Sequence, residues 1–395
     1  MVSTNELIVV DVDSHVAEPE DLWTSRLPVS ARERAPHVEW DPDAGERRWK
    51  VGDILLSSVG EYCTAGWPEP FPSHPPTLEE ADPACWDPKA RLRRLDEEGI
   101  AAQVLYPNII AFDTHAFYDG LGSELALECV RAYNDYITDF ASADPDRLIP
   151  ITMLPFWDVD ASVKEMQRAS AMGHRGVLMA ALLGEIGLKN LHDEVWEPLL
   201  GAAQELELPI NLHVGISSRK KEASEKGWGK LTKTALEERT NRRAFITNSA
   251  ASRSNLVRAI AEVVLYNIPH RFPKLKFVSV ESGFGFLPYT LEHLDWYWGS
   301  SGANLEFPDR ELPSEYWRRQ FFATFWFESA SSALIGEFQD NLMFETDFPH
   351  ETSLQANGKK AVQVAQARSE ELEQSVACKV LSGNAKSLYK LDNVP

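Results

Sequence analysis

Residues 7–19 read LIVVDVDSHVAEP, and this stretch decides how the rest of the chain is interpreted. Its first four residues are apolar, as in a buried strand. Side chains alternate across an extended chain, so Asp11, Asp13 and His15 share one face at the strand's end. Carboxylates and a histidine beside a core are costly to bury unless they pair or bind a cation. The stretch therefore predicts half of a metal site, and a solvated acidic turn is the competing interpretation.

The composition is that of an ordinary soluble globular protein. Of 395 residues, 44% are hydrophobic and 25% are charged, which provides for a large core. The net charge of −21 argues against nucleic acid as a partner. The four cysteines form no C-x-x-C pair, which favours reduced thiols over a disulfide framework. With neither a signal sequence nor an apolar run of membrane-spanning length, we expect a cytoplasmic protein with no membrane partner.

From residue 87 onward, short apolar segments alternate with helical segments. The helix expected at 88–98 is ended by Gly99, and Asp160 is expected to cap another. Eight strands alternating with helices predict an α/β protein with a single (β/α)8 TIM barrel and C-terminal helices over 369–391. An open doubly wound sheet is the alternative, but no glycine-rich dinucleotide-binding loop follows the first strand. The seven later strands are expected at 101–106, 147–153, 173–179, 209–214, 275–281, 321–326 and 341–347.

A long insertion rich in proline, tryptophan and glycine separates the first strand from this regular part. It spans residues 20–86 and is expected to be irregular, apart from a hairpin at 47–54 that turns at Gly52. Long irregular connections in compact proteins usually serve a function. We expect either a lid that forms a wall of the pocket or a dimerisation arm of a homodimer.

Polar residues stand at the ends of four of the expected strands. The first strand supplies Asp13 and His15, the fifth His213, the sixth Glu281 and the eighth Asp347. Active sites of such barrels lie at the carboxyl ends of the strands, so these side chains are expected to converge. Two histidines with carboxylates suit one or two ions of Zn, Mn or Fe. Taken singly, each residue has a structural interpretation, such as a core histidine, a helix cap or a turn.

The chain also resembles a known family through six motifs. The chain is similar to the amidohydrolase superfamily, in its type 2 branch, whose members resemble aminocarboxymuconate-semialdehyde decarboxylase. That family has a metal-dependent (β/α)8 barrel, in agreement with the strand count. The motifs are DVDSHVAEP at 11–19, RGV at 175–177, ELPINLHVG at 207–215, ESGFGFLPY at 281–289, ETDFPH at 345–350 and GNAKSLY at 383–389.

The resemblance implies metal ligands at Asp13, His15, His213 and Asp347. Two positions depart from the common pattern of the family. Asp13 stands where the first ligand is commonly histidine, and Glu281 stands where a histidine commonly acts on water or substrate. The fourth strand carries no lysine for a bridging carbamate, so a pair of ions would need a bridging carboxylate.

A basic segment follows the fifth strand. Residues 219–243 carry nine lysines and arginines against four glutamates, within a region, 216–250, expected over the barrel mouth. Basic groups beside an active site favour an anionic substrate, such as a carboxylate or an acyl-coenzyme A. A solvated helix face is the alternative. Substrate contacts are expected from Glu18, Trp23, Arg219, Lys220 and Lys221.

The preferred interpretation is a metal-dependent hydrolase. Metal-activated water would attack the carbonyl of an ester, thioester, amide or lactone. Asp347, with Glu281, would accept the water proton, and His350 would donate to the leaving group. The alternative is a non-oxidative decarboxylase of an aromatic or unsaturated carboxylic acid, in which Asp347 protonates carbon. A catalytically silent ligand-binding barrel is the third possibility.

Overall fold

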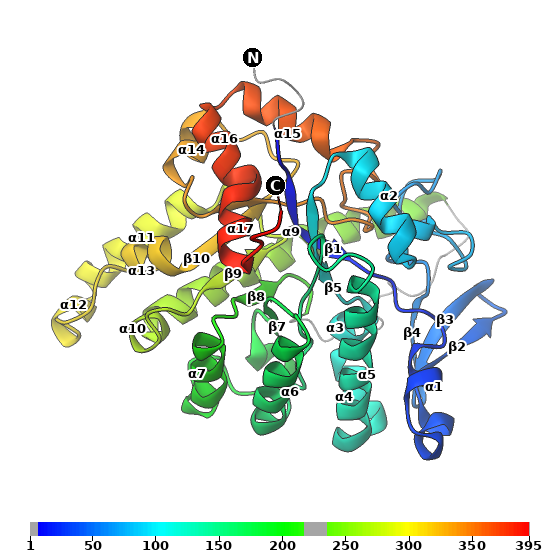
Figure 1. The fold of residues 1–395 in the computed structure, drawn as a ribbon. Coiled ribbons are helices and arrows are strands. Elements are labelled where there is room, and N and C mark those ends of the chain that lie inside the picture. The colour runs from blue at the N-terminus through cyan, green and yellow to red at the C-terminus, as the bar shows by residue number, and fades with distance from the viewer. Residues whose placement is uncertain (1–6, 217–234, 395) are drawn as a thin grey trace.

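Eight parallel strands form a barrel surrounded by helices (Figure 1). The computed structural model describes residues 7–216 and 235–394. The predicted (β/α)8 barrel is confirmed, and each strand lies at or within one residue of its expected segment. The barrel strands are β1 (Val10–His15), β5 (Ala102–Tyr106), β6 (Leu148–Pro150), β7 (Val177–Ala180), β8 (Ile210–His213), β9 (Phe277–Val280), β10 (Phe321–Phe325) and β11 (Leu342–Phe344).

The barrel closes through two isolated contacts between two curved sheets. The strands pair in the orders β1-β5-β6 and β7-β8-β9-β10-β11, and every pair is parallel. Parallel bridges between Thr152 and Val177 and between Ser14 and Phe348 join the sheets. This closure excludes the open doubly wound sheet. All carboxyl ends of the strands meet at one rim.

Nearly every position of the barrel strands is buried. Parallel strands covered on both faces read as continuous apolar runs, which explains the short Val-, Ile-, Leu- and Phe-rich segments. The first strand differs in burying carboxylates, because Asp11 and Asp13 of β1 are completely buried. Buried carboxylates need partners, so β1 is the strand on which the polar interior of the barrel depends.

Helices cover the outside of the barrel. The helix predicted at 88–98 begins at Pro88 and ends before Gly99, whose φ of 70° is the left-handed conformation that ends helices. The predicted cap Asp160 was wrong. Asp158 lies before the first turn in an extended conformation, and its carboxylate accepts a hydrogen bond from the N–H of Ala161 at 2.9 Å. The helices with eight or more residues are α2 (Pro88–Glu98), α4 (Thr114–Leu121), α5 (Ser123–Ala141), α6 (Val159–Ala171), α7 (Glu197–Glu205), α9 (Ala235–Leu265), α11 (Leu287–Ser300), α13 (Pro313–Gln320) and α15 (Ala361–Glu370). The shorter helices are α1 (Leu22–Arg26), α3 (Ile109–Phe112), α10 (Ile268–Arg271), α12 (Ala303–Glu306), α14 (Ser332–Glu337), α16 (Gln374–Cys378) and α17 (Asn384–Tyr389).

The insertion at 20–86 is more regular than expected. It contains an antiparallel sheet of β2 (His37–Asp41), β3 (Glu46–Val51) and β4 (Ile54–Ser58), which lies beside α1 at the edge of the molecule (Figure 1). The predicted hairpin is β3–β4. Its turn requires Gly52, because φ is 58° and a Cβ there would lie 2.7 Å from the carbonyl oxygen of Gly120. The roles of lid and dimerisation arm stay predictions.

The C-terminal segment is helical, as predicted, and runs without a break over residues 374–389. A π-helical turn at Lys379–Gly383 joins α16 to α17. The Tyr389 hydroxyl donates to Asn211 Oδ1 at 2.6 Å and fastens this segment to the barrel interior. Within residues 7–216 and 235–394, no helix combines the length and apolar character needed to cross a membrane.

Candidate metal centre

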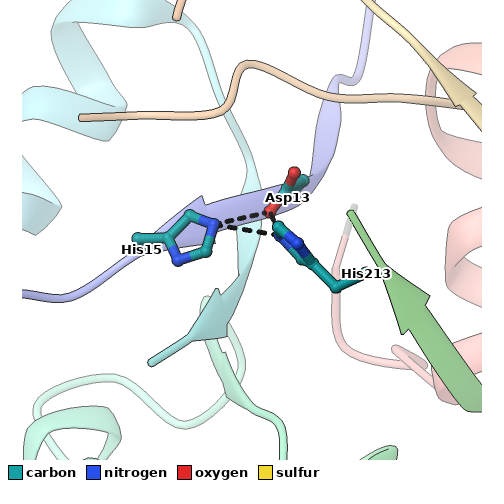
Figure 2. Close-up of side chains that lie close together, drawn as sticks. All are labelled: Asp13, His15 and His213. Atoms are coloured by element: carbon teal, nitrogen blue, oxygen red, sulfur yellow. Dashed lines mark hydrogen bonds and ion pairs between the residues drawn. The ribbon is translucent and has the colours of Figure 1, made fainter. Parts of the chain in front are cut away.

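Three buried side chains converge at the carboxyl rim of the barrel. Figure 2 shows Asp13 and His15 from β1 facing His213 from the end of β8. Asp13 Oδ1 lies 3.3 Å from His15 Nε2 and 3.5 Å from His213 Nε2, and the two Nε2 atoms are 3.2 Å apart. These are three of the predicted metal ligands, and the structure brings them together.

Backbone carbonyls fix the tautomers of both histidines. Nδ1 of His15 contacts the carbonyl oxygen of Pro107 at 3.0 Å, and Nδ1 of His213 contacts that of Val214 at 2.7 Å. A carbonyl only accepts, so each Nδ1 carries the hydrogen and each Nε2 presents a lone pair to the centre. Neither oxygen of Asp13 accepts a hydrogen bond from any described residue. These donors repel one another unless a cation lies between them, so the group fits a divalent transition metal.

The pKa values within this group also indicate that it binds a cation. Burial lowers the pKa of His213, but the Asp13 carboxylate outweighs burial and raises the pKa to about 9. Burial and the neighbouring His350 lower the pKa of His15 to about 4. Without a metal, the group therefore holds one proton on His213, while His15 is neutral at physiological pH and keeps a lone pair on Nε2.

A second group shares His15 and adds two predicted catalytic residues. Asp347 Oδ1 lies 2.9 Å from His350 Nδ1 and 3.8 Å from His15 Nε2. The His350 ring stacks on His15 with centroids 3.9 Å apart, and the Thr352 hydroxyl donates to Asp347 Oδ2. The backbone of Asp347 is left-handed, with φ of 58°, and its N–H donates to the Asp13 carbonyl oxygen at 2.9 Å. Strain of this kind at a strand end is common in active sites.

Glu281 does not join either ligand group. Its Oε1 accepts a hydrogen bond from Arg253 Nη2 at 2.7 Å, and its N–H donates to Glu345 Oε2 at 3.2 Å. Burial, reinforced by Asp347, raises the pKa of Glu281 to about 8. The predicted ligand role of Glu281 is therefore not reproduced, because its carboxylate pairs with an arginine.

The predicted substrate-binding residues have different outcomes. Trp23 is fully buried, packs against Trp49 and Phe117, and donates from its indole N–H to the Cys129 carbonyl oxygen, so its substrate role stays a prediction. Glu18 is buried, and its Oε1 accepts a hydrogen bond from the backbone N–H of Asn108 at 2.9 Å. Arg219, Lys220 and Lys221 lie outside the described residues.

Two residues that support the centre were missed as such. Asp11 accepts hydrogen bonds from the N–H and hydroxyl of Thr346 at 2.8 and 2.6 Å and from Gln103 at 2.7 Å. The fully buried Arg91 donates to the His15 carbonyl oxygen at 2.6 Å and to Gln103 at 3.2 Å. The D-x-D alternation pointed to Asp11. Arg91 had no signal, because it is one of three arginines in an amphipathic helix.

Aromatic rings line one side of the two groups. Phe112 of α3 lies 5.6 Å from the rings of both His15 and His213, measured between centroids. Tyr62 of the insertion stacks on Phe112 at 5.4 Å and lies 5.5 Å from His350. The insertion therefore contributes a ring beside the two ligand groups.

The family model described as Amidohydrolase matches residues 10–391, nearly the whole chain. This protein belongs to the amidohydrolase family. Two curated relatives are decarboxylases. This amidohydrolase is 23% identical over 326 residues to 2-amino-3-carboxymuconate-6-semialdehyde decarboxylase of Dictyostelium discoideum, covering 80% of each chain. It is 24% identical over 311 residues to gamma-resorcylate decarboxylase of Rhizobium sp. (strain MTP-10005), covering 76% of this chain and 86% of the relative.

Solved structures share the fold of this amidohydrolase. An amidohydrolase from Mycobacterium avium subsp. paratuberculosis K-10 matches with a TM-score of 0.73 at 19% identity, covering 97% of this chain and 99% of that one. A dihydroxybenzoic acid decarboxylase from Polaromonas sp. JS666, with bound manganese and 2-nitroresorcinol, matches with a TM-score of 0.61 at 18% identity, covering 98% of each chain.

Proposed function

We propose that this amidohydrolase is a metal-dependent, non-oxidative decarboxylase of a small aromatic carboxylic acid. The observation that carries the proposal is the buried contact of 2.9 Å between Asp347 and His350, directly beside Asp13, His15 and His213. Decarboxylation replaces a carboxylate with hydrogen, so the enzyme must deliver a proton to carbon. We expect the contact between Asp347 and His350 to hold that proton.

The proton belongs to a pair of groups with unusual acidities. Burial, reinforced by the Asp13 charge, raises the pKa of Asp347 to about 7, so this carboxyl keeps a proton close to neutral pH. Burial lowers the pKa of His350 to about 3, so the imidazole is neutral. A carboxylic acid kept protonated by its surroundings is a suitable general acid.

The reaction balances with this one proton. Asp347 protonates the ring carbon that bears the carboxylate. The carbon–carboxylate bond then breaks, its electron pair returns to the ring, and carbon dioxide leaves. When bound at Asp13, His15 and His213, a divalent ion supplies positive charge that orients the anionic substrate. The Asp347 carboxylate afterwards regains a proton from solvent, while the Thr352 hydroxyl keeps its orientation.

The aromatic wall supports an aromatic substrate. Phe112 and Tyr62 offer stacked rings at the edge of both ligand groups. Aromatic pairs contribute about 0.5–1.5 kcal/mol beyond the burial of their area. The names of the curated relatives, which include gamma-resorcylate decarboxylase, also describe decarboxylation of carboxylic acids.

Hydrolysis, the preferred interpretation of the sequence, has weaker support. It needs a deprotonated base to accept a proton from water, but the raised pKa of Asp347 favours an acid. The second expected base, Glu281, is paired with Arg253. The thioester version depended on the basic segment 219–243, of which residues 219–234 lie outside the described part of the chain. The homodimer remains a prediction.

The test uses protein loaded with manganese, zinc or iron(II) in separate samples. Each is incubated in D2O with 2,6-dihydroxybenzoate, 5-carboxyvanillate and an aryl thioester. We expect carbon dioxide and an aromatic product with one deuterium at the former carboxylate position. Thioester cleavage without release of carbon dioxide from any acid would favour the hydrolase instead.

A further inference from the structure

Asn108 is held from three sides at the rim of the barrel, directly after β5. It is buried, with 1% of its surface exposed. Its side-chain nitrogen Nδ2 donates to the Val16 carbonyl oxygen at 3.2 Å, and its backbone N–H donates to Glu18 Oε1 at 2.9 Å. Its Oδ1 lies 2.8 Å from His350 Nε2.

These contacts fix the orientation of the amide. The Val16 carbonyl oxygen only accepts, so the Asn108 nitrogen must face it and Oδ1 must face His350. The reverse orientation would place two oxygens against each other at Val16. Because Oδ1 also only accepts, Nε2 of His350 carries a hydrogen.

The other nitrogen of His350 faces Asp347. Nδ1 lies 2.9 Å from Asp347 Oδ1, a distance at which the two atoms share one hydrogen. We infer that Asn108 is a positioning residue: by accepting a hydrogen bond from Nε2, it holds the His350 ring with Nδ1 directed at Asp347 Oδ1. This inference deepens the proposed function and rests on it for its catalytic consequence.

Pro107, the residue before Asn108, holds His15 by the opposite ring nitrogen. The Pro107 carbonyl oxygen accepts from Nδ1 of His15, which leaves Nε2 of His15 free to face the metal ligands. Asn108 accepts from Nε2 of His350, which leaves Nδ1 to face the acid. Two adjacent residues thus hold two stacked imidazoles by opposite ring nitrogens. His15 presents Nε2 to the candidate metal ligands, and His350 presents Nδ1 to Asp347.

The test replaces Asn108 and reads the tautomer directly. Asn108→Leu removes the acceptor with little change of volume, whereas Asn108→Asp keeps an acceptor toward His350. In metal-free protein with 15N-labelled histidine, the two ring nitrogens have distinct shifts in each tautomer, and His350→Gln assigns the signal. We expect the Nε2–H form in the wild type and in Asn108→Asp, and an averaged signal in Asn108→Leu.

Activity gives a second measurement. We expect Asn108→Leu to lower kcat for decarboxylation about 10- to 100-fold with KM within about twofold. Asn108→Asp should keep the Nε2–H signal but lose stability, because it places a carboxylate oxygen against the Val16 carbonyl oxygen. The matched control is Asn384→Leu, which removes two hydrogen bonds of a buried asparagine, at 2.8 and 2.7 Å, at the start of α17. The control is expected to lose stability but to keep the His350 tautomer and kcat.

Contrary results are distinguishable. An Nε2–H tautomer that survives Asn108→Leu, or a KM that rises while kcat is kept, overturns the role of Asn108. If Asn108→Leu does not fold, a wild-type or Asn108→Asp protein with the Nδ1–H tautomer overturns it equally. A wild type with the expected Nε2–H signal but no release of carbon dioxide supports the positioning of His350 by Asn108 and overturns the proposed function.

Discussion

The Nε2 atoms of His15 and His213 face each other at 3.2 Å while the opposite nitrogen of each ring is committed to a backbone carbonyl. Two lone pairs at this distance, with the Asp13 carboxylate beside them, are a poor arrangement without a cation. The metal-free protein therefore binds a proton where the ion belongs.

Metal uptake is expected to release protons. The Asp13 carboxylate, opposing burial, raises the pKa of His213 to about 9, so His213 is protonated in the metal-free protein at pH 7.5. Its folded pKa lies above this pH, and the ion can bind only the deprotonated ring. Calorimetric titration in buffers of different ionisation enthalpy should give about one proton per ion. Affinity should fall about tenfold per pH unit below pH 9, and uptake without proton release would contradict the assignment.

The Asp347→Asn variant should separate chemistry from metal binding. The amide keeps the shape but cannot donate the acid proton, so kcat should fall about 10²- to 10⁴-fold. Metal content should remain near that of the wild type, because Asp13, His15 and His213 are intact. Carbon dioxide release and elemental analysis measure the two effects. Asp340→Asn, at an exposed aspartate paired with Lys379, is the matched control. A variant that keeps full activity would exclude Asp347 as the acid.

Phe112→Leu should weaken substrate binding more than chemistry. The substitution keeps an apolar side chain but removes the ring beside His15 and His213. Loss of about 1 kcal/mol of aromatic stacking should raise KM roughly fivefold at nearly constant kcat. Steady-state kinetics with an aromatic acid measures this change. Trp40→Leu, at an exposed aromatic residue of β2, serves as the control. An unchanged KM would argue against a ring at this wall.

His174 should make the protein sensitive to acid. It is buried, and its ring lies between the hydroxyls of Thr152 and Thr138 at 3.0 and 2.9 Å. Burial lowers the pKa of His174 from 6.5 to about 3, so below pH 6.5 the unfolded chain binds a proton that the folded chain refuses. The stability it contributes at neutral pH is lost at about 1.4 kcal/mol per unit as the pH falls from 6.5 toward 3.

Urea unfolding at pH 7 and pH 5 tests this. His174→Gln removes the group, so the difference in unfolding free energy between wild type and variant should shrink by about 2 kcal/mol between these two pH values. Parallel stability curves for the two proteins would show that His174 does not titrate in this way.

The barrel and the convergence of the candidate ligands could be predicted because both follow from strand ends. Short apolar runs gave the strands, and parallel closure brings Asp13, His15, His213 and Asp347 to one rim wherever their strands lie in the sequence. The alternation of β1 placed Asp13 and His15 on the same face.

Contacts made between separate elements were beyond the reach of the sequence. Glu281 pairs with Arg253 of α9, which precedes it by 28 residues and shares no periodic pattern with it. The indole of Trp23 is covered by Trp49 and Phe117, which come from other parts of the fold. Asn108 lies in the stretch PNII, and nothing in these residue types indicates that the Asn108 amide forms a hydrogen bond with a histidine. Such pairings depend on tertiary packing rather than on local pattern.

The seam that closes the barrel joins two segments that lie far apart in the sequence. Ser14 bridges Phe348, the N–H of His15 donates to the Phe348 carbonyl oxygen at 2.6 Å, and Asp347 donates to the Asp13 carbonyl oxygen. The first ligands are thus translated more than 300 residues before the acid beside them. A nascent chain on the ribosome carries Asp13 and His15 without the partners that shape the centre. Closure of the barrel and assembly of the reactive centre therefore coincide, so that a chain that ends before residue 342 lacks both.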